Sequence, residues 1–490
     1  MKNLFTLLLL VFAIASINAQ NEIDALRYSS IHFGGTARHN AMGGAFGALG
    51  GDLSSATINP AGIGVYRSSE FNFSTALLSN RGATSYLGNS FDVTKLNFNF
   101  NNVGYVGSID VASSAAGWQR INIALGYNRI ANFNNRYYVE GVNPTSSAID
   151  QWVNTLNQNG GVDAFEINNS SEFYQGPNMA WQTYLIDLDT NATTTPYYSA
   201  LKGYNQTQRY SVKEKGSIGE SFLALGANYA NKLYVGATVT TSKIRYNYEA
   251  LYRESVADDD TSNYLQEFSV GEIIDTEGRG YNAKIGLIYR PIDFLRLGAS
   301  IQTPTFFSMS DNWSTDIESI FEDTTFYFAD PEGNYDYILS TPFRATLSAA
   351  IQVGKLGLVS GDYEFINYSA SRLQSLNGDY GFSTENSAIH SLYHRTGNLR
   401  LGSEWRIQQF RIRAGYSFYG NPLKSDLFPS KAYATYSAGV GFKGDGFYID
   451  LAYNLSQKSG QFYLYDSASL ESTVTSNNLH RITGTVGFRF

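Results

Sequence analysis

The feature that most constrains the fold is a strict alternation of apolar and polar side chains. In the last ten residues, "RITGTVGFRF", the two rows are Ile482, Gly484, Val486, Phe488 and Phe490 against Arg481, Thr483, Thr485, Gly487 and Arg489. The same period of two recurs at residues 121–127, 233–239, 281–289, 295–302, 399–407 and 410–418. Alternation of this kind indicates β-strands with one apolar face and one polar face. The chain is therefore predicted to be all-β.

Connection lengths separate the two architectures that such strands can build. In a soluble sandwich the apolar faces form the core, whereas in a transmembrane barrel they face lipid. We expect fourteen strands, near residues 68–78, 95–109, 118–133, 217–229, 232–250, 278–290, 295–303, 341–353, 356–368, 397–407, 410–420, 432–443, 447–456 and 479–490. Every second connection is short, and the long ones include residues 134–216, 304–340, 369–396 and 457–478. An even strand count with this asymmetry predicts a transmembrane antiparallel β-barrel over residues 68–490.

Composition supports the barrel. After the N-terminus there is no apolar run of the roughly 18 residues that a transmembrane helix needs. Aromatic residues make up 15% of the chain, with 36 Tyr and 31 Phe beside 46 Gly, which suits aromatic belts around a barrel. The formal charge is −8, and nothing resembles the basic stripe of a nucleic-acid-binding protein. The chain has no Cys, so disulfides, thiolate metal sites and a lipid-anchored cysteine are excluded.

Residues 1–19 are predicted to be a secretory signal peptide. Lys2 precedes an apolar run over residues 4–17, and the small residue Ala19 stands at a plausible cleavage site. An exported barrel that ends on the aromatic Phe490 is expected in the outer membrane of a Gram-negative bacterium. Its expected partners there are outer-membrane lipid and the barrel-assembly machinery.

Residues 20–67 precede the first strand and carry little alternation. They contain the glycine-rich run "GGTARHNAMGGAFGALGGD" and then the turn Asn59-Pro60-Ala61. Such a segment is too short for an independent core and must be buried against something else. Because the lumen of a fourteen-strand barrel is wide enough to need filling, we predict that residues 20–67 form a hatch that plugs it.

With this N-terminal segment and this strand count, the chain resembles the FadL-type outer-membrane transporters of long-chain fatty acids and other hydrophobic compounds. The match rests on Asn59, Pro60 and Ala61, on the glycine-rich approach to them and on fourteen strands. The resemblance implies a monomeric passive transporter that captures ligand at its extracellular loops. It also implies a hatch that moves on binding, with Asn59-Pro60-Ala61 in the gating turn, and an exit through the wall at a kinked strand. Two positions are candidates for that kink: the phase break at Asn101 and Asn102, and Gly126.

Two loop segments have helical apolar stripes. In the first, Ser146 or Ser147 would cap the start and Gly160 or Gly161 the end of a helix whose stripe is Ile149, Trp152, Val153 and Leu156. The stripe of the second is Trp313, Ile317, Ile320 and Phe321. Facing each other, the two helices would form a groove for an acyl chain. The alternative is that the stripes only pack the loops onto one another.

A ligand carboxylate would need a cation on the polar face of a strand. Lys284, Arg400 and Arg413 stand at such positions. The alternative is that these cations pair with acidic residues of the wall, such as Asp362, Glu364 or Glu404, or with the hatch.

Other chemistry is less well supported by the sequence. His390 and His394 have the spacing of two helical ligands but lack a third, and the run 258–260 of aspartates lacks the spacing of a calcium loop. No hydrolase, zinc-protease or phosphate-loop motif occurs, so neither an enzyme nor a cofactor is expected. The alternative functions, suggested by barrels of similar type, are a secretion-associated protein like the type IX secretion shuttle and a hemin-binding receptor.

Overall fold

The computed structural model describes residues 21–31, 34–111, 117–158, 162–170, 173, 176–189, 196–257, 259–378, 380–424, 432–467 and 470–490. The predicted signal peptide and the helix-ending glycines 160 and 161 lie outside these residues. None of the helices in the described ranges is long and apolar enough to cross a membrane.

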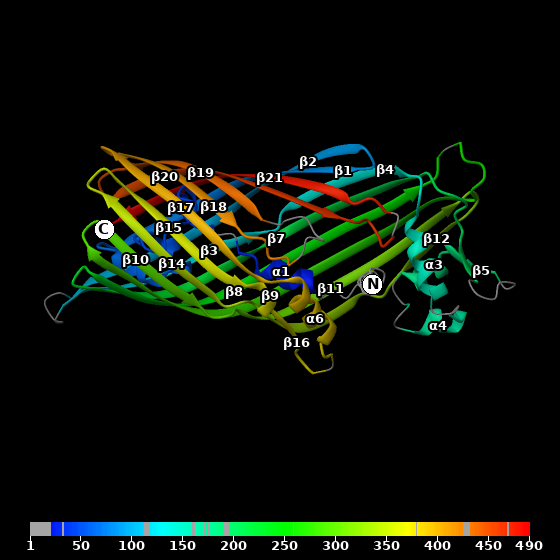
Figure 1. The fold of residues 1–490 in the computed structure, drawn as a ribbon, viewed down its shortest axis with the longest axis horizontal. Coiled ribbons are helices and arrows are strands. Elements are labelled where there is room, and N and C mark those ends of the chain that lie inside the picture. The colour runs from blue at the N-terminus through cyan, green and yellow to red at the C-terminus, as the bar shows by residue number, and fades with distance from the viewer. Residues whose placement is uncertain are drawn as a thin grey trace, which may run out of the picture.

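Fourteen antiparallel strands close into a barrel, as the alternation and the connection lengths predict (Figure 1). The first strand pairs with the last, for example Phe73 with Val486. The wall contains, in order, β1 (Glu70–Tyr86), β2 (Asn89–Asp110), β3 (Trp118–Asn132) continued by β4 (Asn135–Asn143), β7 (Gln206–Tyr229), β8 (Leu233–Ser255), β9 (Leu265–Ile292), β10 (Leu295–Gln302) continued by β11 (Phe306–Phe321), β13 (Gly333–Ser340) continued by β14 (Arg344–Val353), β15 (Gly357–Asn367), β17 (Arg395–Ile407), β18 (Phe410–Tyr419), β19 (Tyr433–Lys443), β20 (Phe447–Phe462) and β21 (Thr473–Arg489).

The barrel has its polar side chains inside and its apolar side chains outside. In β21, Thr483 and Thr485 are buried, whereas Ile482 is 45% exposed and Phe488 is 50% exposed. The same inversion holds around the wall, where large apolar side chains dominate the outer face. A soluble sandwich would bury these side chains, so the exposed apolar face identifies a lipid-facing surface.

Several strands are longer than the alternation predicts. Residues 304–340, expected to be a loop, mostly form β11, β12 (Thr325–Ala329) and β13. The expected helix through Trp313, Ile317, Ile320 and Phe321 is therefore wrong, because all four lie in β11. Residues four apart share a face in a strand as well as in a helix, so Trp313, Ile317 and Phe321 still face one way, and Ile320 faces the other.

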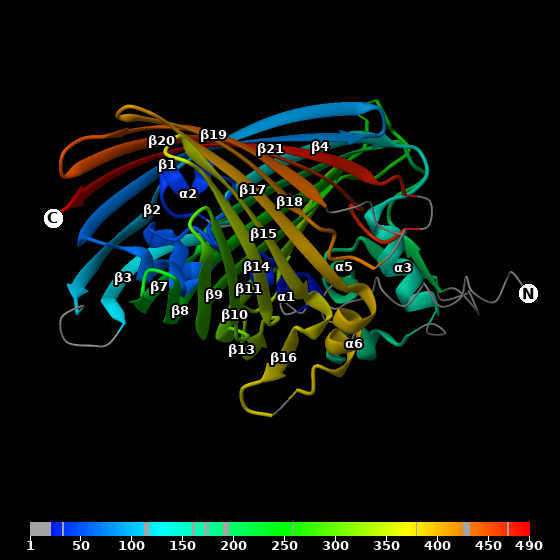
Figure 2. The ribbon, with the colours of Figure 1, turned by 60° about the vertical axis from the view of Figure 1, so that its left-hand side comes forward.

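The hatch lies inside the barrel (Figure 2). Its elements are α1 (Glu22–Ser29), α2 (Ala37–Ala41) and the 3₁₀ helices η2 (Leu53–Thr57) and η3 (Pro60–Val65). Inward-facing wall side chains bind its backbone: Thr485 accepts from the Ala37 N–H, and Ser300 and Ser417 donate to the carbonyls of Ile58 and Gly43. Part of the polar inner face of the wall is thus satisfied by the segment that fills it.

The long connections carry small elements of their own. These are α3 (Ala148–Gln158), α4 (Ala164–Asn169), α5 (Pro177–Gln182), β5 (Ile186–Leu188), β6 (Tyr197–Ser199), η4 (Tyr368–Ala370), β16 (Arg372–Ser375) and α6 (Ser383–Leu392). Figure 1 shows α3, α4 and β5 together at the end of the barrel opposite the C-terminus. This is the end at which the long loops were expected, and the short turns lie at the other.

Candidate functional site

Asn59 fixes the turn Asn59-Pro60-Ala61 to both the hatch and the wall. Its Nδ2 donates to the carbonyl of Gly47 at 2.6 Å and to that of Leu287 in β9 at 3.1 Å. Its Oδ1 accepts the Ala61 N–H at 3.1 Å and so caps η3, with Pro60 in the first turn. Asparagine suits this place because it is both a donor and an acceptor, and proline suits it because the first turn needs no N–H.

A row of glycines in the wall receives η3. Gly226, Gly236 and Gly286 lie directly opposite one another on β7, β8 and β9. A Cβ atom on Gly236 would lie 2.3 Å from the carbonyl carbon of Pro60, and one on Gly286 would lie 1.9 Å from Oδ1 of Asn59. The row therefore lets hatch backbone touch wall backbone, which no larger residue permits.

The backbone ladder between β2 and β3 is incomplete. Pairing ends at Asn102 with Asn128, and within the described residues β2 has no strand partner on this side from Asn89 to Asn101. Asn101 is an extra residue in the β1–β2 register, which confirms the bulge expected there. Gly126 of β3 lies in the regular ladder with β2. The strand that contains it is interrupted further on, between β3 and β4.

We call this break in the ladder the seam: residues 93–101 of β2 facing residues 129–135 of β3 and β4. Side chains bridge it. Arg129 Nε donates to the carbonyl of Phe100 at 3.2 Å, and Asn132 donates to Oδ1 of Asn97 at 3.3 Å. Unpaired backbone is costly in a membrane-spanning wall, so a wall that gives up its ladder here is expected to do so for function.

The hatch covers the seam from inside. Asn101 donates from Nδ2 to the carbonyl of Gly35. A Cβ atom on Gly34 would lie 2.1 Å from the carbonyl oxygen of Arg129. Residues 34 and 35 thus contact both edges of the seam, and any movement of this part of the hatch would uncover it.

Cavities inside the lumen lead to the seam. One of them, of about 410 Å³, lies between α1 and the wall and is lined by Leu26, Phe133, Tyr433 and Leu479 among others. Two smaller ones, of about 60 and 10 Å³, share Asn132 with it and reach Arg129 and Arg481. Together they outline a path from the upper lumen to the seam.

Two cations that the sequence analysis did not single out line this path. Lys458 lies with its Nζ 4.4 Å from the centre of the Tyr433 ring, and Arg481 reaches the two smaller cavities. Among the described residues no acidic side chain forms an ion pair with Arg481. Arg481 is on the polar face of the last strand, and this position in the alternation is the sequence feature that could have identified it as a residue of the lumen.

The cations expected to meet a carboxylate are instead paired with wall acids. Lys284 contacts Glu220 at 2.5 Å, Arg400 contacts Glu364 at 2.8 Å, and Arg413 contacts both Glu404, at 2.7 Å, and Asp450, at 2.6 Å. All of these side chains are buried. These cations therefore follow the alternative given above, in which they pair with acidic residues of the wall.

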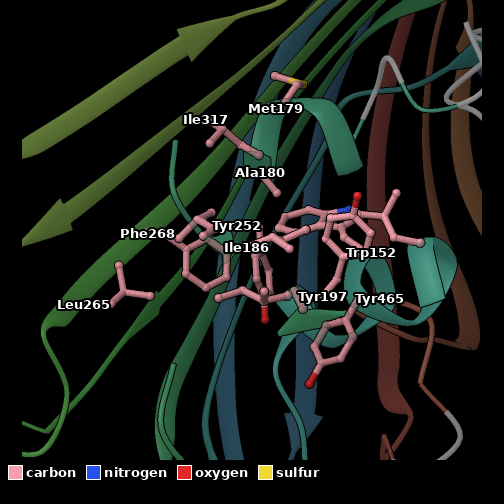
Figure 3. Close-up of a cluster of buried hydrophobic side chains, with 14 of the residues drawn as sticks. Trp152, Met179, Ala180, Ile186, Tyr197, Tyr252, Leu265, Phe268, Ile317 and Tyr465 are labelled. Carbon is pink, nitrogen blue, oxygen red and sulfur yellow. The ribbon is translucent and has the colours of Figure 1, made fainter. Parts of the chain in front are cut away.

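The first loop stripe lies inside a packed cluster. α3 begins with a capping pair in which Ser147 Oγ accepts from the Ile149 N–H and the Asp150 carboxylate accepts from the Ser147 N–H. Ile149 and Leu156 are fully buried, Trp152 is 8% exposed, and Val153 packs at the edge. Figure 3 shows Trp152 among Phe268, Tyr252 and Ile317. The stripe thus packs the loops onto the upper wall, and its role in ligand capture stays a prediction.

Burial shifts the pKa values of two hatch groups. It raises the pKa of Asp24 to about 7, although the adjacent Arg27 opposes the shift. It lowers the pKa of His39 to about 4, although Asp52 opposes that shift. Both changes favour the uncharged form. At neutral pH His39 is therefore uncharged, whereas Asp24 is about half ionised and pairs with Arg27.

His390 and His394 do not share a helix, and Asp258 of the aspartate run lies outside the described residues. His390 is in α6, but His394 follows the end of that helix and its Nε2 lies 2.9 Å from the carbonyl of Asn421. Asp260 accepts hydrogen bonds from Ser262 and Asn263. The described ranges hold no group of three or more side chains suited to a metal.

Solved structures with a similar fold include a FadL homologue and two toluene transporters. The chain resembles a Pseudomonas aeruginosa FadL homologue with a TM-score of 0.56 and 12% identity, over 94% of this chain and 100% of that one. It resembles the Pseudomonas putida toluene transporter TodX (TM-score 0.53, 13% identity, 94% and 99%) and the Ralstonia pickettii toluene transporter TbuX (0.50, 15%, 93% and 98%). No protein-family model and no curated protein matches the sequence. At these identities the likeness concerns the fold.

Proposed function

Because the chain has the fold of the FadL-type hydrophobic-compound channels, we propose that it is a passive outer-membrane transporter of long-chain fatty acids. Ligand captured at the long loops enters the upper lumen, the hatch moves, and the ligand leaves through the seam into the membrane. The observation that carries the proposal is the seam itself, a wall section without a backbone ladder whose two edges contact the hatch.

The cations along the path support an apolar acid as substrate. An acyl chain would gain roughly 0.8 kcal/mol for each buried CH₂, so tight binding needs few polar contacts. A carboxylate head group would be attracted to Arg481 and Lys458, which an uncharged hydrocarbon would not need. The charge of the path therefore supports a fatty acid over an uncharged hydrocarbon as the ligand.

Uptake by cells that lack their own transporter tests the function. We expect saturable uptake of labelled oleate that requires this protein. Arg481→Gln should lower oleate uptake several-fold and leave labelled toluene uptake unchanged, because only oleate has a negative charge that Arg481 can attract. Arg136→Gln, at an exposed position of β4, is the matched control. A folded barrel in the outer membrane that takes up neither compound would refute the proposal.

Asn59→Ala is expected to impair gating more than assembly. The change removes the contacts to Gly47, Leu287 and the Ala61 N–H, and a buried group left unsatisfied costs about 1–3 kcal/mol. The strands do not depend on these contacts, so the barrel should still form. Heat-modifiable electrophoretic mobility measures assembly and oleate uptake measures gating. Deletion of residues 34–58 should have the same pattern with a larger effect, and normal uptake by both variants would contradict it.

A further inference from the structure

A second cavity lies below the hatch, at the short-turn end of the barrel. Its volume is about 530 Å³, and hatch residues from Leu49 to Asp52 line it on one side. Its nine cationic side chains are Arg38, Arg67, Arg296, Lys355, Arg406, Arg411, Arg413, Lys443 and Arg489, against the acids Asp52, Asp293, Glu404 and Asp450. We call it the basic chamber. The chain as a whole has a formal charge of −8, whereas the lining of this chamber is positively charged. A concave wall of one charge focuses the electrostatic potential inside it.

The acids of the basic chamber do not neutralise it. Glu404 is engaged by Arg38 and Arg413, both at close range, and Asp450 by Arg413. Asp293 pairs with Arg290 on the outside of the turn. Within the described part of the chain, Arg406, Arg411 and Lys443 have no acid at ion-pair distance.

Those three cations converge. Arg406 and Arg411 are direct cross-strand partners on β17 and β18, where like charges destabilise a sheet. They continue the inward rows that contain the buried Glu404 and Arg413. Lys443, at the end of β19, lies two residues beyond Gly441, the cross-strand partner of Arg411, and so belongs to the same face. Such an arrangement is unfavourable when empty and is relieved by an anion.

The chamber is also joined to the hatch. Arg296 donates to the carbonyl of Leu49 at 2.7 Å, and Arg38 donates to that of Gly51 at 3.0 Å. Its contents therefore lie against the segment proposed to move. The transport path lies on the other side of the hatch, so the chamber is a separate place and does not depend on the proposed function.

We propose that the basic chamber binds a small organic anion, with a carboxylate or phosphate group held by Arg406, Arg411 and Lys443. Guanidinium groups bind both oxyanions through paired hydrogen bonds. The volume lies in the range of roughly 300–1,000 Å³ that is usual for small-molecule sites. The three cations stand at the mouth of the chamber: Arg406 and Lys443 are exposed, and Arg411 also donates to the carbonyls of Gln408 and Phe410. The concave lining favours a small ligand over the surface of an acidic protein.

Calorimetric titration of the purified full-length protein tests the site with two probes, inorganic pyrophosphate and hexanoate. The double variant Arg406→Gln/Arg411→Gln should bind the accepted probe at least about tenfold more weakly, since two charge-assisted contacts are lost. The matched control is Arg136→Gln/Arg372→Gln, which removes the same charge from exposed positions in β4 and β16. Heat-modifiable mobility shows whether each variant is folded.

The outcomes divide clearly. The site is supported if the protein binds pyrophosphate, hexanoate or both saturably and only the chamber variant loses this binding. The probe that binds then identifies the head group as phosphate or carboxylate. Equal weakening in the two double variants would assign the binding to net charge and overturn the proposal. Absence of saturable binding by the folded wild type would overturn it as well. Binding of poly-glutamate but of neither small probe would replace the small ligand with an acidic protein partner.

Discussion

Replacement of Gly236 by valine is expected to force the hatch away from the barrel wall. The new side chain would begin 2.3 Å from both the carbonyl carbon and the oxygen of Pro60 and 2.6 Å from the nitrogen of Ala61. All three are backbone atoms and cannot rotate aside. Overpacking of a buried site costs about 1–3 kcal/mol, and more where backbone must move. We expect the hatch to be displaced while the strands of the barrel stay paired.

Planar-bilayer conductance measures this displacement, because a displaced hatch leaves the lumen open to ions. Gly236→Val should show a higher and noisier conductance than the wild type. Gly484→Val is the matched control: it is also a strand glycine, but a Cβ atom there has open space around it. Equal conductance of the two variants would mean that the glycine row does not position the hatch.

Glu364→Gln is expected to cause the largest loss of stability in the wall. The carboxylate accepts hydrogen bonds from Arg344 at 2.7 Å, Arg400 at 2.8 Å and Asn398 at 2.8 Å. A neutral amide leaves two buried guanidinium groups without their counter-charge, and breaking a buried pair costs about 3–5 kcal/mol. Arg344 also donates to the carbonyl of Ser29, so the loss should reach the end of α1.

Urea unfolding in lipid vesicles measures this effect as a lower midpoint. Glu249→Gln is the control, because Glu249 pairs with Lys213 and Lys215 at an exposed site and should change stability by only about 0–1 kcal/mol. If the two variants unfold at the same urea concentration, the buried cluster does not stabilise the wall.

The strands were predictable because one physical requirement repeats along the chain. Every strand must present apolar side chains to lipid and polar ones to the lumen, and this leaves the alternation seen from Ile482 to Phe488. The bulge at Asn101 was visible as a change of phase. In these cases local sequence and global fold express the same constraint.

The remaining features depend on contacts between distant segments. The spacing of Trp313 and Ile317 fits a strand as well as a helix, and only the pairing of β11 with β9 decides between them. The partner of Lys284 is Glu220, 64 residues away, which no local pattern reveals. The register of β3 with β7 shifts between Arg129 and Ala131, close to the interruption between β3 and β4. The sequence analysis placed a strand over residues 118–133 and a loop after it, so the second edge of the seam was missed.

The side-chain bridges across the seam also set the free-energy cost of opening it. Separating its edges breaks no ladder and loses only a few contacts, such as Asn132 to Asn97 and Arg129 to Phe100, each worth about 1 kcal/mol. A gap of about 3 kcal/mol leaves the open form populated in roughly one molecule in a hundred. A ligand would therefore not need to pry the wall apart. It would only need to bind the open form, so the larger share of the cost of passage is expected to lie in the contacts between the hatch and the wall.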